Sequence, residues 1–168
     1  EFQMDQNIVY PLRIPLDNLS ELEESLVLCN TGIKHDSGNI HKDQRNQMKQ
    51  KDVQALVQKN VKLCYKIRNQ LLRGSLLEFG ASLNDAWQLK RRLSNAISNT
   101  HLDDIYTNAM SNGAIGGKLL GAGGGGFFLF FVPPSKKHDL LSHLTSAGLE
   151  VKPFRFESEG LKSWKVRL

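Results

Sequence analysis

The stretch that most constrains this chain is GGKLLGAGGGGFFLFFVPP, residues 116–134. Seven of its first eleven residues are glycine, and an aromatic run closed by two prolines follows. A glycine inside a strand or helix costs roughly 0.5–1 kcal/mol relative to alanine, so such a run is kept where backbone bends sharply or another group comes close. Aromatic residues favour strands. The segment therefore predicts two strands, over 116–122 and 127–132, joined by glycines.

No charge occurs between Lys118 and Lys136. That length approaches the lower limit of roughly 17 residues for a membrane span. The five glycines within it and the closing Pro133 and Pro134 favour a buried strand pair instead. We therefore expect no membrane partner.

The chain has 168 residues, enough for one domain with a substantial core. Residues 1–10 contain no secretory signal, and the absence of an initial Met suggests a fragment of a longer protein. Cys29 and Cys64 both lie in apolar patterns, which favours buried, reduced thiols. These features indicate a cytoplasmic protein.

Apolar spacing and turn residues predict the remaining elements. Pro11 and Pro15 interrupt residues 1–24, which we expect to be a connector or an edge strand. A strand over 25–32 comes next, and a long helix over 41–73 should end at Gly74. Helices beside a few strands indicate an α+β fold.

Three further helices and a last strand complete the prediction. Ser75 and Glu78 match a capping box that opens a helix reaching Leu93. Thr100 with Asp103 is expected to cap a short helix that ends at residues 112–113. A helix over 135–148 and a strand over 149–157 follow.

The alternation of the aromatic strand predicts a core and an exposed face. One core is expected to hold these side chains: Leu119, Phe128, Phe130 and Val132, with Leu26, Leu28, Val61 and Leu83. Phe127, Leu129 and Phe131 would point the other way and form an apolar patch open to a second copy of the chain. At least two of the glycines among residues 121–126 should have positive φ or a backbone too crowded for a Cβ atom.

Two common glycine motifs do not fit the loop. Gly121, Gly123 and Gly126 have G-x-G-x-x-G spacing, but a dinucleotide site requires a helix directly after it. A phosphate-binding Walker A loop would require Ser or Thr after Lys118, where the chain has Leu119. A loop between two strands remains, whose successive N–H groups either form an anion-binding nest or simply allow tight packing.

Other candidate site residues have two interpretations each. Lys118 could reach a phosphate or be a solvated strand end. A polar loop follows the first buried strand and suits ligand contacts or a capped turn; its candidate residues are Thr31, Gly32, Lys34, His35 and Ser37. His101, His138 and His143 have no partner at metal-ligand spacing and Cys29 and Cys64 form no C-x-x-C pair, so we expect no metal site.

Positive charge suggests a different function. Residues 42–73 contain nine Lys or Arg and two Asp, a net charge of +7, which could follow phosphates on nucleic acid. Tyr65 is the single aromatic residue there and no nucleic-acid motif accompanies it, so a solvated helix face is favoured. A third alternative is an interaction or regulatory module without catalysis, with a closed surface around residues 121–126.

Four segments of the chain resemble one protein family: GAIGGKLLGAGGGGFFLFFV, YPLRIP, LVLCNTGIKHDSG and AWQLKRRLS. They are similar to the C-terminal half of GHMP kinases, in the branch with the heptose-phosphate and fucose kinases. The resemblance implies a ferredoxin-like α+β domain over 25–168, with a small antiparallel sheet covered by helices on one side. Residues 1–24 would connect it to a missing N-terminal domain.

The resemblance also implies a site. The glycine loop would pack beside the phosphate loop of the N-terminal domain, where ATP, Mg²⁺ and a sugar or sugar phosphate meet. The residues implied near the phosphate are Lys118, Gly121, Ala122, Gly123, Gly124, Gly125 and Gly126. The family's P-x-x-G-L-G-S-S-A loop does not occur in this chain, and phosphoryl transfer needs that cradle, Mg²⁺ and an oriented nucleophile. We therefore assign no catalytic residue, and expect the chain alone to be inactive and to hold no cofactor tightly.

Overall fold

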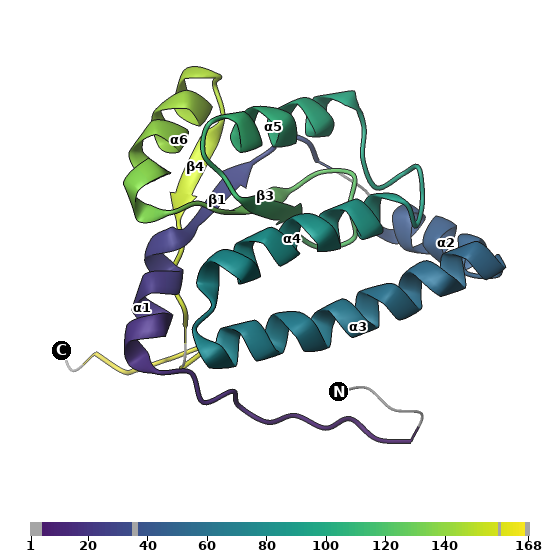
Figure 1. Cartoon of the computed structure of the whole chain (residues 1–168), viewed down its shortest axis with the longest axis horizontal. Coiled ribbons are helices and arrows are strands. Elements are labelled where there is room, and N and C mark those ends of the chain that lie inside the picture. Colours follow the sequence, from purple (N-terminus) through teal and green to yellow (C-terminus); the bar gives the residue numbers. More distant parts are fainter. Residues whose placement is uncertain (1–4, 35–36, 158, 167–168) are drawn as a thin grey trace.

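The computed structural model describes residues 5–34, 37–157 and 159–166. Their helices and strands follow one another as shown in Figure 1: α1 (Leu16–Ser25), β1 (Leu26–Asn30), α2 (Ser37–Gln47), α3 (Lys51–Arg73), α4 (Leu76–Arg91), α5 (Thr100–Ser111), β2 (Gly116–Leu119), β3 (Phe127–Phe131), α6 (Pro134–Ser146) and β4 (Glu150–Pro153). Among the described residues, no helix has the length and apolar character needed to cross a membrane.

The four strands form one antiparallel sheet in the order β2-β3-β1-β4. β2 and β3 are a hairpin in which Lys118 pairs with Leu129, and β1 lies between β3 and β4. Helices connect β1 to β2 and β3 to β4, which is the β-α-β-β-α-β connectivity of ferredoxin-like folds. The predicted α+β class with a small antiparallel sheet is confirmed.

One face of the sheet packs on a cluster of aromatic rings. Phe128 and Phe130 of β3 stack with their ring centroids 5.2 Å apart, and both are fully buried. Trp87 of α4 meets Phe128 edge-on at 5.4 Å, and Tyr106 of α5 lies 5.9 Å from Phe130. Leu140 of α6 completes the cluster. These contacts fix the glycine hairpin to three helices.

Helices also cover part of the opposite face, so the expectation of helices on one side only is wrong. Leu22 of α1 and Phe79 of α4 pack there around Phe131, which is 1 % exposed. α4 reaches both faces because it runs along the edge strand β2. The expected exposed patch is therefore wrong for Phe131, whereas Phe127 and Leu129 are half-buried. Self-association through this face stays a prediction.

The predicted core is confirmed for four residues of the hairpin: Leu119, Phe128, Phe130 and Val132. The prediction was wrong for Leu26 and Leu83. The register pairs Leu26 with Phe131 on the second face of the sheet, and Leu83 packs in the same cluster. Leu28 is half-buried rather than in the core. Val61 is 51 % exposed, since α3 turns a neighbouring stripe of residues toward α4.

The long basic helix is in fact two helices. The helix is interrupted at residues 48–50, because α2 packs Ile40 into the aromatic core while α3 runs beside α4. Residues 41–52 are almost entirely polar, so no apolar stripe continues through the break. Gly74 ends α3 in the left-handed conformation, as predicted.

Details of three other helices differ from the prediction. Residues 16–25 form a helix rather than a strand or connector, and its Leu22 is buried; the domain boundary at residue 25 stays a prediction. Ser75 precedes α4 but makes no side-chain cap hydrogen bond, so the capping box is wrong. Asn99, not Thr100, caps α5, because its Oδ1 accepts the N–H of Leu102 at 3.0 Å.

Both cysteines are free thiols, as expected. Cys29 is buried on β1, and burial raises the pKa of its thiol to about 11. Cys64 is exposed, contrary to the prediction, because it lies on the outer side of α3. The last strand is also shorter than predicted and ends at Pro153.

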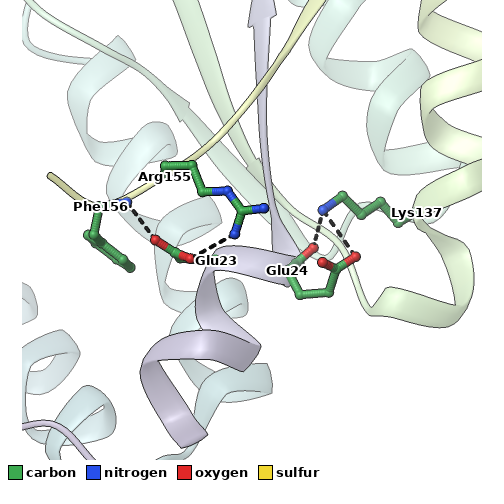
Figure 2. A network of polar contacts seen from close by, with 5 residues as sticks. All are labelled: Glu23, Glu24, Lys137, Arg155 and Phe156. Carbon is green, nitrogen blue, oxygen red and sulfur yellow. Dashed lines mark hydrogen bonds and ion pairs between the residues drawn. The ribbon is translucent and has the colours of Figure 1, made fainter. Parts of the chain in front are cut away.

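Beyond β4 the chain returns to α1 through the polar contacts in Figure 2. Arg155 donates to Glu23 at 3.1 Å, and the N–H of Phe156 donates to the same carboxylate at 2.6 Å. The Phe156 hydrogen bond is the main reason that the pKa of Glu23 lies below its usual value. Lys137 of α6 pairs with Glu24 at 3.3 Å. These contacts hold α1, α6 and the C-terminal segment together.

Candidate functional site

The glycine loop, residues 120–126, connects β2 to β3 at the end of the hairpin. Four of its glycines have positive φ, which confirms the conformational prediction: 69° at residue 121, 124° at 123, 75° at 124 and 93° at 126. Position 125 requires glycine for a different reason, because an added Cβ would lie 2.6 Å from the carbonyl oxygen of Ile33. The glycines are therefore required by the local backbone.

Two neighbouring segments hold the loop in place. The N–H of Gly124 donates to the carbonyl of Ile97 at 2.8 Å, and the N–H of Gly126 donates to Ile33 at 3.1 Å. The carbonyl of Gly126 accepts from both the backbone N–H and the hydroxyl of Thr31, at 2.8 and 2.9 Å. The two loops singled out in the sequence thus lie against each other.

These hydrogen bonds limit which backbone amides of the loop could form the expected anion-binding nest. The amides of Gly124 and Gly126 are already bonded within the protein, so they are not free for a ligand. In the described part of the chain, the amides of residues 121–123 and 125 have no hydrogen-bond partner. Gly121 is exposed and lies two residues after the end of β2. Any phosphate contact would therefore use the first half of the loop.

Lys90 of α4 is an important residue that sequence reasoning missed. Its ammonium group donates to the carbonyl of Leu119 at 3.0 Å and to that of Gly121 at 2.5 Å, which fixes the entry to the loop. Burial, together with the nearby charge of Lys118, lowers the pKa of Lys90 to about 8. Lys118 itself is half-buried. Two cationic side chains thus lie at the start of the glycine loop.

A hydrogen-bonded turn after α4 supports the other side of the loop. It contains Ile97, which is fully buried and lies 3.0 Å, at its Cα, from the position of a Cβ on Gly123. Ser94 in this turn donates to Asp43 of α2. Arg91 pairs with Asp103 of α5 at 2.7 Å. The segment AWQLKRRLS carried the signal for Lys90, Arg91 and Ser94, but spacing alone could not show their contacts.

The candidate residues of the polar loop after β1 differ in burial and in their contacts. Thr31 is buried, and a ring nitrogen of His101 lies 3.2 Å from its carbonyl oxygen. Gly32 and Lys34 are exposed, and Ser37 is the first residue of α2. His35 lies outside the described residues. Among the residues that the structure describes, no three His, Cys, Asp or Glu side chains gather as a metal site.

Replacing Lys90 with methionine should change how stability depends on pH. The pKa of Lys90 is lowered in the folded state, so between about pH 8 and its unfolded value of about 10.4 the unfolded chain binds more protons. The parent protein should therefore gain stability relative to Lys90→Met as the pH rises through this range. Urea unfolding of both proteins at several pH values measures the difference, in which the titration of groups far from Lys90 cancels. A constant difference would contradict the lowered pKa of Lys90 in the folded protein.

The fold and the glycine loop agree with one protein class. Residues 67–148 match the family model described as "GHMP kinases C terminal". These residues of the chain therefore form a GHMP kinase C-terminal domain.

Individual relatives include two kinases of phosphorylated heptoses and a mevalonate kinase. The chain is 35 % identical over 159 residues to D-glycero-alpha-D-manno-heptose 7-phosphate kinase of Campylobacter jejuni, covering 95 % of this chain and 47 % of the relative. The crystal structure of a D-glycero-D-manno-heptose 1-phosphate kinase from Bacteroides thetaiotaomicron is 25 % identical, with a TM-score of 0.63, and covers 98 % of this chain and 43 % of that one. Mevalonate kinase of L. major, in complex with R-mevalonate, is also 25 % identical, with a TM-score of 0.66 and coverage of 72 % and 37 %. The chain thus spans about half the length of the curated relative it matches.

Proposed function

We propose that this chain forms one wall of the active site of an ATP-dependent sugar kinase, a transferase whose substrate is a heptose phosphate. The observation that carries the proposal is the glycine loop, which is held in a hydrogen-bonded frame with two lysines at its entry. The sequence identity of 35 % to a heptose 7-phosphate kinase, over 95 % of this chain, supports a heptose rather than fucose as the sugar.

The free part of the loop fits a phosphate better than it fits a metal. Gly121 is exposed, and its amide and the ammonium groups of Lys90 and Lys118 are donors, which stabilise anionic oxygens. ATP would supply the transferred phosphoryl group. Mg²⁺ would need carboxylate ligands, and the described residues around the loop offer no cluster of them. We therefore propose that a partner domain holds Mg²⁺ and orients the sugar hydroxyl.

The proposal predicts no phosphorylation of D-glycero-D-manno-heptose 7-phosphate by the purified chain alone. ATP binding should be about millimolar or weaker, because each hydrogen bond to an anion nets only about 1.5–3 kcal/mol before the costs of association. Fusion to the N-terminal half of the Campylobacter relative, or its addition in trans, should produce ATP-dependent phosphorylation. A coupled assay for ADP release, with and without the heptose phosphate, measures this.

Two variants of the fused protein test the role of the loop. Gly123→Val should lower kcat by about 100-fold, since small displacements of positioning groups have costs of that order. Gly160→Ala is the control, because its φ of 66° carries a left-handed backbone penalty while an added Cβ there meets no atom within 4 Å and the residue lies outside the loop. Turnover by the isolated chain, or full activity of Gly123→Val, would show that the active site is built elsewhere.

A further inference from the structure

A second candidate site lies between α3 and α4, away from the glycine loop. It is a groove of about 480 Å³, and no residue of the glycine loop lines it. That volume is within the range of roughly 300–1,000 Å³ found for small-molecule sites. Its lining residues are Lys59, Lys62, Leu63, Lys66, Asp85, Gln88, Leu89 and Arg92.

Positive charge converges on this groove from both helices. Lys59, Lys62 and Lys66 follow one side of α3 at spacings of three and four residues, and Arg92, just past the end of α4, faces them. Asp85 is the single carboxylate in the lining, so four cations minus one anion leave +3. Its contact with Lys66 is long, at 3.9 Å, and both side chains are more than half exposed. Such a pair neutralises little of the field.

The floor of the groove is apolar. Leu63 is 8 % exposed and Leu89 is half-buried beside it. A ligand would thus meet hydrocarbon below and charged groups around the rim, and Gln88 adds an amide that can donate and accept hydrogen bonds. This combination suits a compact molecule with several anionic groups and a less polar body.

From this geometry we infer that the groove binds a small molecule carrying two or more phosphate groups. Nucleic acid fits less well, because no aromatic side chain lines the groove to stack on a base. Tyr65, the aromatic residue of α3, lies instead under the guanidinium of Arg68, at 5.1 Å. The other cations of α2 and α3 do not line the groove, and they provide the background of positive charge against which binding in the groove must be compared.

The groove shares α4 with the proposed active site. Lys90 holds the glycine loop, whereas Gln88, Leu89 and Arg92 line the groove on another side of the same segment. A bound polyphosphate would neutralise mutual repulsion of the cations and fix α4 against α3. Ligand binding in the groove thus stabilises the helix that positions the loop.

Titration of the 168-residue chain with inorganic tripolyphosphate tests this inference. We expect saturable one-to-one binding by calorimetry and a rise in melting temperature, both reduced at high salt. Chemical shifts in NMR spectra should change first at the amides around Leu63 and Leu89. Lys62→Gln with Lys66→Gln should weaken binding by about tenfold per lysine, the equivalent of one charge-assisted hydrogen bond each.

A double variant with the same net charge is the control. Lys49→Gln with Lys51→Gln removes two exposed cations that do not line the groove, and should retain the parent affinity. Equal losses in both double variants would overturn the inference in favour of diffuse attraction. It would also fail if the groove variant left binding unchanged, since the anion would then sit at the glycine loop, or if no binding occurred. Tighter, groove-dependent binding of a short DNA duplex would replace it with a nucleic-acid surface.

Discussion

Replacing Trp87 with alanine should lower the free energy of unfolding by about 4 kcal/mol, the usual cost of removing a large buried aromatic side chain. Trp87 is fully buried and contacts Phe128 edge-on at 5.4 Å and Tyr106 at 6.0 Å. The cavity would lie between α4, α5 and β3, where the surrounding rings have little freedom to collapse. Urea unfolding monitored by circular dichroism gives the difference directly.

Trp87→Phe is the matched control for that experiment. The indole Nε1 is buried and has no hydrogen-bond partner among the described residues, so its removal relieves a desolvation cost. We expect Trp87→Phe to cost less than about 1.5 kcal/mol. If it is as damaging as Trp87→Ala, the indole N–H has a partner, and the explanation based on ring packing is incomplete.

Gly116→Ala should be the most damaging single-methyl change, with a loss of about 3 kcal/mol or more from overpacking. A Cβ on Gly116 would lie 2.0 Å from the carbonyl oxygen of Gly80 and 2.8 Å from the backbone nitrogen of Asn84. Both atoms belong to the backbone of α4, which cannot rotate away as a side chain can. The helix would have to move off β2 and would carry Lys90 with it.

Gly121→Ala separates this steric effect from conformational strain. Its φ is 69°, but no atom lies within 4 Å of the added Cβ, so only the left-handed backbone is penalised. A loss of about 1 kcal/mol is expected. Thermal denaturation of the two variants beside the parent should rank Gly116→Ala well below Gly121→Ala. The reverse order would mean that α4 does not approach β2 as closely as the structure has it.

Local signals were sufficient for the hairpin. Glycine and aromatic residues have strong preferences of their own, so the two strands, the loop between them and its positive φ angles could be predicted, although β2 ends at Leu119 rather than at residue 122. Gly74 and the turn at Gly113 were predictable for the same reason. The candidate site was found because its glycines are unusual in themselves.

Local sequence signals could not show which distant residues each side chain contacts in the folded structure. Alternation shows that Leu26 and Val27 face opposite ways, but only the pairing of Leu26 with Phe131 decides which core each one enters. Lys90 could not be recognised, because its partners Leu119 and Gly121 lie about thirty residues further along the chain. The break between α2 and α3 was missed because polar residues there give no periodicity to interrupt.

The two outer strands of the sheet restrict how another domain can join this one. The helix α4 packs closely against β2. β4 is four residues long, carries the paired charges of Glu150 and Lys152, and ends at Pro153, which has no N–H to donate. Neither edge is suited to accept an extra strand. The proposed partner domain would therefore bind through side chains and loops, so it could separate and close again without breaking a continuous hydrogen-bonded ladder.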